Sequence, residues 1–455
     1  MEALLSINPF TQEKINEYSQ DTPEDIQQII ADSHLSFKKW SQKSHLERCS
    51  LSAELAKVLS EKKQDLALLI TSEMGKPLRE SLAEIEKCVW LCNHYSIVES
   101  SHLPNETINT DAKEVNLSYE PLGVLFAIMP WNFPFWQVFR FSVPTITSGN
   151  TVILKHAPNV TGCSKAIEQL FIEAGYPSGV FHSVVIQADR SEEIIQHPFV
   201  RGVTLTGSEQ AGRAVASLAG KHLKKSVLEL GGSDPFIVFH DADFLNSCTT
   251  GMISRMMNAG QVCIAAKRFI VHSSVYETFI AFQSEALLAL KAGDPLDLST
   301  DLGTMARPDL VDKIEQQVNT SVSMGAKVVC GGHRHPDQPL IYLPTLLTDV
   351  RPGMPVYEEE TFGPVMIVLP FNTDDEAIAL ANDTRFGLGA SIWTKDLEKV
   401  RKIIPFLEAG AVFVNSLVKS DPRVPFGGIK NSGYGKELAH AGIKEFMNLK
   451  INWIA

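Results

Sequence analysis

Short apolar runs alternate with amphipathic segments from Val115 onward, and this alternation constrains the fold more than any other feature of the chain. Such runs are typical of strands buried on both faces of a parallel sheet, and the segments between them are typical of helices that cover the sheet. The pattern predicts an α/β fold with a doubly wound sheet, followed by a second α/β series. The strands are expected at 123–129, 151–154, 180–185, 203–206, 236–239, 269–272, 328–330, 366–369, 390–393 and 411–415.

The first hundred residues are predicted to be helical. Residues 22–25, Thr-Pro-Glu-Asp, combine a hydroxyl N-cap, a proline at the first helical position and acids in the first turn, which together favour a helix start. Further helices are expected over 46–74, where a Gly-Lys-Pro sequence follows, and over 82–98.

Length and charge limit the organisation of the chain and its partners. The chain has 455 residues, 44% of them hydrophobic, which predicts two or three domains. Its formal net charge of −12 disfavours nucleic acid and anionic membranes as partners. No apolar stretch reaches the length of about 18 residues that predicts a membrane span, and the first ten residues lack the pattern of a signal peptide.

The seven cysteines are scattered along the chain and odd in number, which fits a reducing cytoplasm better than a disulfide framework. Cys88 and Cys92 lie four positions apart on an expected helix, but no second pair of ligands lies nearby. We therefore expect buried thiols there and no metal site.

Two segments carry residue types suited to nucleophilic catalysis. Residues 258–263, Asn-Ala-Gly-Gln-Val-Cys, place a polar run before an expected interior strand, which suits a loop that presents the Cys263 thiol; a buried core cysteine is the alternative. Glu229 lies between two leucines and before two glycines, where an unused carboxylate is costly to bury. It suits a general base of raised pKa, and a capping or hinge carboxylate is the alternative.

Two further segments suit the binding of an oxyanion and of a phosphate. Pro130 and Pro134 stiffen the backbone around Asn132, whose amide is a suitable oxyanion donor or an ordinary turn residue. Gly207 and Ser208 join an expected strand to a helix start, where free N–H groups can bind a pyrophosphate or simply be capped. The glycine-rich dinucleotide fingerprint is absent, so these residues alone do not identify a standard Rossmann site.

Taken in chain order, these segments resemble the aldehyde dehydrogenase superfamily over essentially the whole chain. Within the superfamily, the short length and the sequence Lys-His-Ala-Pro-Asn at 155–159 are similar to the bacterial succinate-semialdehyde dehydrogenase group. The motifs are Pro-Trp-Asn-Phe-Pro (130–134), Thr-Gly-Ser (206–208), Glu-Leu-Gly-Gly (229–232), Gly-Gln-x-Cys (260–263), Glu-Glu-x-Phe-Gly-Pro (359–364) and Pro-Phe-Gly-Gly (425–428).

The resemblance implies an NAD(P)-dependent oxidation of a small aldehyde. Cys263 would attack the aldehyde to give a thiohemiacetal and then a thioester, and Glu229 would activate the water that hydrolyses it. The Asn132 side chain and the Cys263 N–H would form the oxyanion hole. The implied cofactor-binding residues are Trp131, Lys155 at the adenine ribose, Gly207, Ser208 at the pyrophosphate, Glu360 at the nicotinamide ribose, and Phe362.

The resemblance also implies a substrate that carries a carboxylate, such as succinate semialdehyde. Arg140 and Ser420 match the residues with which semialdehyde dehydrogenases of this superfamily bind the substrate carboxylate. A salt bridge is the alternative role for Arg140. A second arginine expected six residues before the nucleophile is Met257 here, and Lys419 and Arg423 are candidates to compensate for it. Glutarate semialdehyde or an aliphatic aldehyde is the alternative substrate, and a non-catalytic family member is the alternative function.

Pro158 bears on the choice of cofactor. Many NAD-preferring members have at this position a glutamate that binds the ribose hydroxyls and repels a 2′-phosphate. Pro158 offers no such carboxylate, so NADP is not excluded, and no arginine is placed beside it to attract a 2′-phosphate, so NAD is expected.

Domains and oligomer follow from the resemblance alone. It implies a Rossmann-type cofactor domain (1–108 and 122–231), an α/β catalytic domain (232–434) and a small bridging β-sheet (109–121 and 435–455). The bridging segments would join the chain into a homodimer or homotetramer.

Overall fold

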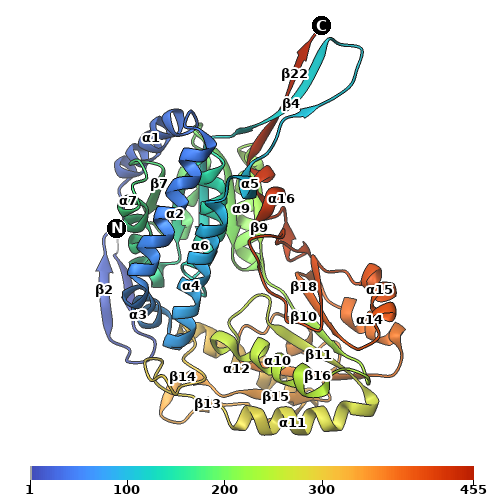
Figure 1. Ribbon diagram of the computed structural model, residues 1–455. Coiled ribbons are helices and arrows are strands. Elements are labelled where there is room, and N and C mark those ends of the chain that lie inside the picture. The colour runs from blue at the N-terminus through green and yellow to red at the C-terminus, as the bar shows by residue number, and fades with distance from the viewer. Residues whose placement is uncertain (1–2) are drawn as a thin grey trace.

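Two α/β units and a projecting β arm make up the computed structural model of the protein, which describes residues 3–455 (Figure 1). The upper unit contains a six-stranded sheet that is parallel except for its edge strand β21. In sheet order its strands are β21 (Gly433–Tyr434), β9 (Lys225–Glu229), β8 (Val200–Thr206), β5 (Val124–Met129), β6 (Thr151–His156) and β7 (Phe181–Val184).

The lower unit contains a seven-stranded sheet that is parallel except for its edge strand β12. In sheet order its strands are β12 (Lys327–Cys330), β15 (Thr345–Thr348), β16 (Val365–Phe371), β11 (Ala266–His272), β10 (Asp234–Val238), β18 (Gly389–Trp393) and β19 (Ala411–Val414). Each strand expected from the sequence overlaps a strand of one of these two sheets, and the α/β fold class is confirmed.

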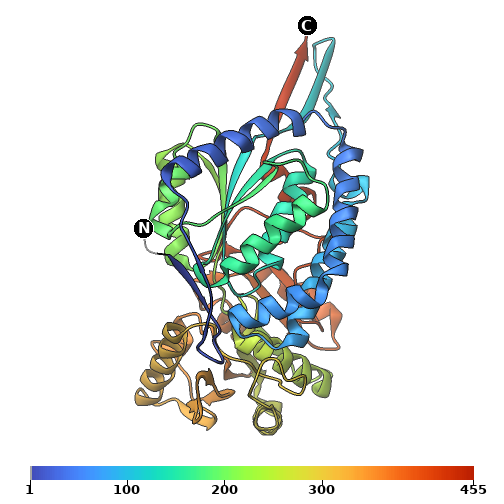
Figure 2. The same ribbon diagram turned by 90° about the vertical axis from the view of Figure 1, so that its left-hand side faces the viewer.

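Helices pack on both faces of the upper sheet (Figure 2). Successive residues of β5 point to opposite faces, as strand geometry requires, so Val124 and Phe126 contribute to one core and Leu125 and Ala127 to another. The first core includes residues of α1 (Pro23–Trp40), α8 (Ser191–Ile195) and α9 (Glu209–Lys221). The second includes residues of α2 (His45–Glu61), α3 (Lys63–Met74), α4 (Leu78–Tyr95), α6 (Trp136–Thr147) and α7 (Thr161–Glu173).

The remaining elements complete the lower unit and the connections. The remaining helices are α5 (Val98–Ser101), α10 (Phe244–Met256), α11 (Tyr276–Leu288), α12 (Pro308–Ser323), α13 (Pro355–Glu358), α14 (Asp374–Asn382), α15 (Leu397–Ile403) and α16 (Ala439–Glu445). Two short antiparallel pairs are β13 (Arg334–His335) with β14 (Gln338–Tyr342), and β17 (Phe386–Gly387) with β20 (Ile429–Lys430).

The helical prediction for the first hundred residues is correct in part. Thr22 caps α1 in a reciprocal capping box with Asp25, as the sequence indicates. The helix expected over 46–74 breaks at Lys62 into α2 and α3. The prediction is wrong before residue 20, where β1 (Leu4–Ile7) and β2 (Lys14–Tyr18) form an antiparallel pair that is too short to give a clear alternation in the sequence.

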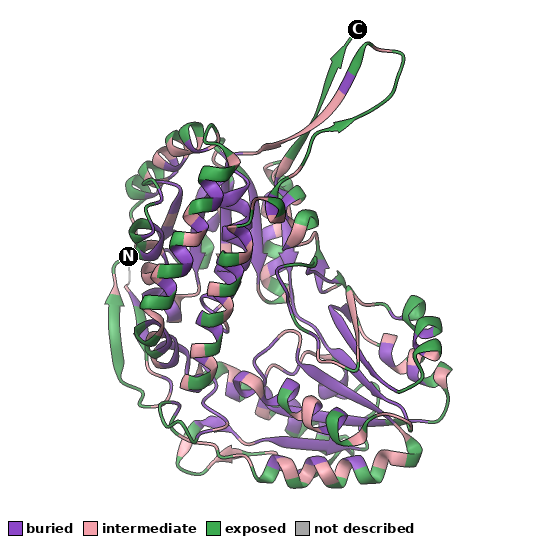
Figure 3. Ribbon diagram, in the orientation of Figure 1, coloured by how far each residue is buried: buried purple, intermediate pink, exposed green. Residues whose placement is uncertain are grey.

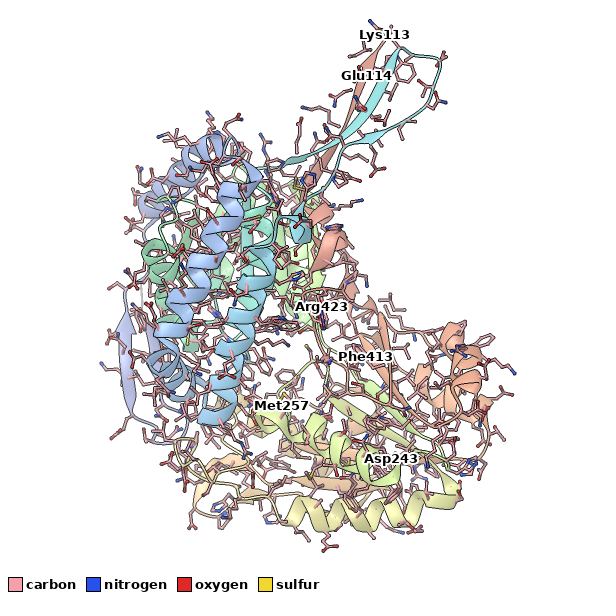
Figure 4. All side chains as sticks on the ribbon, viewed as in Figure 1. Lys113, Glu114, Asp243, Met257, Phe413 and Arg423 are labelled. Carbon is pink, nitrogen blue, oxygen red and sulfur yellow. The ribbon has the colours of Figure 1, made fainter. Side chains whose placement is uncertain are left out.

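The arm consists of β4 (Glu114–Pro121) between β3 (Glu106–Thr107) and β22 (Met447–Ile454). It projects away from the body of the chain, with Lys113 and Glu114 near its far end (Figures 1 and 4). The sheets of the two units are largely buried, whereas most of the arm is exposed (Figure 3). The predicted pairing of the two bridging segments is therefore present, while the domain boundaries stay a prediction.

Cys88 and Cys92 lie in the second core of the upper unit, as expected for buried thiols. Among residues 3–455, no helix is long and apolar enough to cross a membrane.

Candidate active site

The candidate residues gather where the two sheets meet. Asn132 follows β5, Lys155 lies near the end of β6, and Ser208 follows β8. Because these strands are parallel, their carboxyl ends share one edge of the upper sheet, where open α/β sheets bind ligands. Glu229 ends β9 at the same edge, and only four residues then separate it from β10 of the lower sheet.

The other candidate residues precede strands of the lower sheet. Cys263 lies three positions before β11, and Glu360 and Phe362 lie just before β16. The carboxyl edge of one sheet thus faces the amino edge of the other. A Cβ atom at Gly232 would lie 2.8 Å from the carbonyl oxygen of Cys263, so the double glycine after Glu229 allows this close approach.

Cys263 is partly exposed and lines a pocket of about 520 Å³, whereas the other six cysteines are buried. The loop before it is strained, because Asn258, Ala259 and Gly260 adopt consecutive φ angles of 52°, 51° and 72°. Left-handed conformations cost free energy for residues other than glycine, and strain of this kind is concentrated at functional sites. Glu80 of α4 contributes to holding the loop, since its Oε2 accepts a hydrogen bond from the Asn258 N–H at 2.8 Å.

Two cations act on the Cys263 thiol. Burial raises the pKa of this thiol to about 11, and the positive charges of Arg140 and Lys267 partly offset the effect. Lys267 is buried, and its Nζ donates to the carbonyl oxygen of Cys263 at 2.7 Å and to that of Val262 at 3.0 Å. These two cations are the groups in the structure that favour the thiolate.

The Glu229 carboxylate is buried, and neither of its oxygens has a hydrogen-bond partner among residues 3–455. Burial raises its pKa to about 8, and the nearby Arg140 charge opposes the shift. A Cβ atom at Gly427 would lie 2.7 Å from Glu229 Oε1, so the glycine of the Pro-Phe-Gly-Gly motif (425–428) allows the chain to pass beside the carboxylate. An unpaired buried carboxylate is costly for stability and is typical of a catalytic group.

Asn132 contacts the nucleophile loop directly. Its Nδ2 donates to the carbonyl oxygen of Gln261 at 2.9 Å, and its own carbonyl oxygen accepts from Asn258 Nδ2 at the same distance. The backbone N–H of Cys263 donates no hydrogen bond to any described residue. A free N–H beside a fixed amide group is the arrangement that an oxyanion hole requires.

Helix α4 fixes the loop that carries Asn132. Oε1 of Glu84 accepts hydrogen bonds from the N–H groups of Phe135 and Trp136 at 2.8 and 2.9 Å, at the start of α6. Oε2 of Glu84 forms a buried ion pair with Lys76, whose Nζ also donates to the Asn132 carbonyl oxygen at 3.4 Å. The charged groups of α4 thus hold both loops that approach the thiol.

The residues assigned to the cofactor fit a dinucleotide. Lys155 is buried and has no carboxylate within 4.0 Å among the described residues; burial lowers its pKa to about 8. Ser208 caps α9 by accepting from the Ala211 N–H at 3.2 Å, and Gly207 precedes it. An unpaired buried cation and a helix start at one sheet edge suit the hydroxyl and phosphate groups of NAD(P).

Glu360 lies between this region and the thiol. Its Oε1 accepts from the Gly232 N–H at 3.1 Å and lies 3.6 Å from Lys267 Nζ. The rings of Trp131 and Phe362 are in edge-to-face contact with centroids 5.8 Å apart.

The predicted substrate residues line the same pocket as Cys263, but their contacts differ. Ser420 Oγ accepts hydrogen bonds from Lys87 Nζ at 3.0 Å and from Trp136 Nε1 at 3.1 Å. Arg140 is buried in an ion pair with Glu437. The salt-bridge role, raised from the sequence as an alternative for Arg140, is thus present together with its position in the pocket.

Of the cations near the missing second arginine, Lys419 lines the pocket, whereas Arg255 and Arg423 have other partners. Met257 lines the pocket, whereas Arg255 donates to backbone carbonyls, among them that of Thr361 at 2.9 Å. Arg423 forms an ion pair with Asp421 at 2.6 Å, and Lys419 lines the pocket as an exposed side chain. Figure 4 shows Met257 and Arg423 at the junction of the two units.

Sequence reasoning missed six charged residues around this site, namely Lys76, Glu80, Glu84, Lys87, Lys267 and Glu437. Glu80, Glu84 and Lys87 follow each other at helical spacings of four and three, which places all three on one face of α4. That spacing was the available signal, but a charged helix face is ordinarily exposed to solvent.

The chain matches the aldehyde dehydrogenase family over residues 2–452, and it belongs to this family. Among its relatives, the probable succinate-semialdehyde dehydrogenase [NADP(+)] of Synechocystis is 44% identical over 453 residues, which is 100% of both chains. The succinate semialdehyde dehydrogenase [NAD(P)+] of Escherichia coli is 41% identical over 449 residues, 99% of this chain and 97% of the relative. A crystal structure of the succinic semialdehyde dehydrogenase of Streptococcus pyogenes with NADP+ superposes with a TM-score of 0.97 at 34% identity, covering 99% of this chain and 100% of the other.

The raised pKa of Glu229 predicts how thioester hydrolysis depends on pH. Below its pKa of about 8 the group is mainly the neutral acid, which cannot take a proton from water. The hydrolysis rate is therefore expected to rise with pH from 6 to about 8 and to level off above that value. Single-turnover measurements of acyl-enzyme decay across this range test the expectation, and a flat profile from pH 6 to 9 would count against Glu229 as the base.

Proposed function

We propose that the protein oxidises succinate semialdehyde to succinate with NAD or NADP, through a thioester on Cys263. The observation that carries the proposal is one pocket that contains the partly exposed thiol together with cationic side chains and the Ser420 hydroxyl. The substrate named for relatives that match the whole chain supports the same conclusion.

The residues of the site suit each step of the reaction. The Cys263 thiolate, favoured by Arg140 and Lys267, attacks the aldehyde carbon, and the resulting oxyanion accepts hydrogen bonds from the Asn132 amide and the Cys263 N–H. Loss of hydride from the thiohemiacetal leaves a thioester on the sulfur. Glu229, as carboxylate, takes a proton from water, and the water oxygen attacks the thioester to release succinate and the thiol.

NAD(P), when bound, accepts the hydride that the thiohemiacetal loses. Trp131, Lys155, Gly207, Ser208, Glu360 and Phe362 are the residues proposed to hold it. Pro158 presents no carboxylate to repel a 2′-phosphate, and Lys155, which has no ion-pair partner among the described residues, lies three positions before it on β6. We therefore propose that the enzyme accepts both cofactors, in agreement with the cofactors named for the relatives.

The arm is the proposed oligomer contact. Strand β22 carries the exposed apolar side chains of Leu449, Ile451 and Trp453, which a single copy of the chain leaves in contact with water. The predicted homodimer or homotetramer would bury them.

A panel of aldehydes tests the proposed function. Succinate semialdehyde and butanal have the same chain length and differ in the terminal carboxylate. We expect kcat/KM for succinate semialdehyde to exceed that for butanal by at least about tenfold, the size of one charge-assisted hydrogen bond. Glutarate semialdehyde belongs in the panel because a pocket of about 520 Å³ does not itself exclude a longer chain. Equal or better turnover of butanal would identify an aliphatic aldehyde dehydrogenase instead.

A further inference from the structure

Lys87, a residue of α4 without an assigned role, extends into the pocket that contains Cys263. Its Nζ lies 3.0 Å from Ser420 Oγ and 4.0 Å from the centre of the Trp136 ring. Trp136 Nε1 donates to the same hydroxyl oxygen at 3.1 Å. An ammonium, an indole N–H and a hydroxyl therefore converge at one place in the pocket wall.

These three groups offer more hydrogen-bond donors than the described residues around them accept. Ser420 Oγ accepts from both Lys87 and Trp136, and its own O–H donates to no described residue. The ammonium carries three N–H groups, of which Ser420 accepts one. Several donors and one positive charge facing the same space are complementary to a carboxylate.

Lys87 is a partly buried cation of the pocket that has no ion-pair partner among residues 3–455. Within the described chain, no carboxylate lies within 4.0 Å of its Nζ. Lys419 lacks such a partner too, but it is exposed, so that water screens its charge. The paired groups are Arg140 with Glu437, Arg79 with Asp301, and Glu84 with Lys76. Glu80 is in no ion pair of the described residues and accepts a hydrogen bond from the Asn258 N–H.

The two carboxylates whose charges act on Lys87 are each paired with another cation. Glu84 and Asp421 act on its charge, but Glu84 is ion-paired with Lys76 and Asp421 with Arg423. Burial lowers the pKa of Lys87 to about 8, with the Arg140 charge acting in the same direction. A cation held in this position is stabilised by a bound anion and costs stability without one.

Arg140 is placed differently, although the family resemblance assigns it to the substrate. Its guanidinium pairs with the buried Glu437 and stacks 4.5 Å from the centre of the Phe426 ring. Its charge acts on both Glu229 and Cys263. Its ion pair and its charge thus serve the reacting groups, while Met257 leaves the second arginine position without a cation.

We propose that Lys87, together with the Ser420 hydroxyl that the Trp136 N–H holds in place, binds the distal carboxylate of the substrate and sets the preference for a semialdehyde. This assignment rests on the proposed function. In this assignment Lys87 of α4 supplies the positive charge that the expected second arginine, replaced here by Met257, would supply.

The test compares Lys87→Met with the unaltered enzyme on succinate semialdehyde and butanal, using either cofactor. Methionine keeps the unbranched apolar stem of the side chain and removes the charged Nζ that lies over Trp136. We expect the ratio of kcat/KM between succinate semialdehyde and butanal to fall at least about tenfold, mainly through KM. Competitive inhibition by succinate should weaken to a similar degree. Lys87→Arg keeps the positive charge and should retain part of the preference for succinate semialdehyde and part of the inhibition by succinate.

Two control variants separate this role from a structural one. Lys57→Met removes an exposed lysine of α2 and is expected to leave the ratio unchanged. Arg140→Met is expected to lower kcat for both aldehydes and to leave their ratio within about threefold. In the unaltered enzyme, KM for succinate semialdehyde should rise above pH 8 as Lys87 loses its proton, and this rise should be absent in Lys87→Met.

Different outcomes overturn the two proposals. An unaltered enzyme that does not prefer succinate semialdehyde over butanal overturns the proposed function. A preference that survives in Lys87→Met, or disappears in Arg140→Met alone, overturns the role of Lys87 and leaves the proposed function standing. Thermal unfolding of each variant shows whether the fold is kept, and Lys87→Arg supplies the comparison if the methionine variant does not fold.

Discussion

Replacement of Cys263 by alanine is expected to abolish aldehyde oxidation, with a loss of more than about four orders of magnitude in kcat. Without the sulfur no thiohemiacetal forms, and the Asn132 amide and the Cys263 N–H have no oxyanion to stabilise. The variant should still bind NAD(P), because the proposed cofactor residues belong to other segments of the chain. Reduced-cofactor absorbance measures the turnover, and quenching of protein fluorescence measures the binding.

A second cysteine serves as the control for this loss. Cys330 lies on the edge strand β12 of the lower sheet, away from the pocket lining, and Cys330→Ala should keep turnover within about threefold. Turnover above about 1% in Cys263→Ala would contradict the assignment. An unaltered enzyme without any turnover of aldehydes would instead indicate a non-catalytic member of the family.

Replacement of Glu229 by glutamine should separate the two halves of the reaction. The amide keeps the shape of the side chain but cannot take a proton from water, so the thioester forms and then hydrolyses slowly. We expect a burst of about one reduced cofactor per active site, followed by a steady state about 10²- to 10⁴-fold slower than in the unaltered enzyme. Rapid-mixing absorbance resolves both phases.

The burst is the informative part of that result. If Glu229 instead acts before the thioester forms, by taking the thiol proton, the burst itself slows and the two phases merge. Glu54→Gln, at an exposed position of α2, provides a matched control and should show the kinetics of the unaltered enzyme.

Although β9, β15 and β21 were not among the strands expected, local sequence patterns were sufficient to predict most strands of both sheets. Their strands are apolar runs whose pattern does not depend on distant residues, and Thr22 carries its capping signal within four positions. The pair β1 and β2 was missed because its strands are too short for a clear alternation, and part of its contacts are to a distant element. Ser6 donates to the buried Glu73 of α3 at 2.6 Å, a contact that no local pattern indicates.

The residues of the candidate site also differ in whether a local sequence motif contains them. Residues within motifs, such as Asn132 and Ser208, follow the ends of predicted strands, so predicting the strands places them at one edge. Lys87 and Glu437 belong to no motif, and tertiary packing alone brings them to the pocket and to Arg140. Most lysine and glutamate residues are exposed to solvent, so the sequence does not distinguish these two from surface residues.

The most direct test of the central claim is the mass of the Glu229→Gln enzyme, quenched in acid after mixing with succinate semialdehyde and NADP. The proposed reaction predicts one succinyl group per chain, located on the peptide that contains Cys263, because the thioester forms and persists in this variant. Unmodified protein after a full burst of reduced cofactor, or an acyl group on any other side chain, would contradict it.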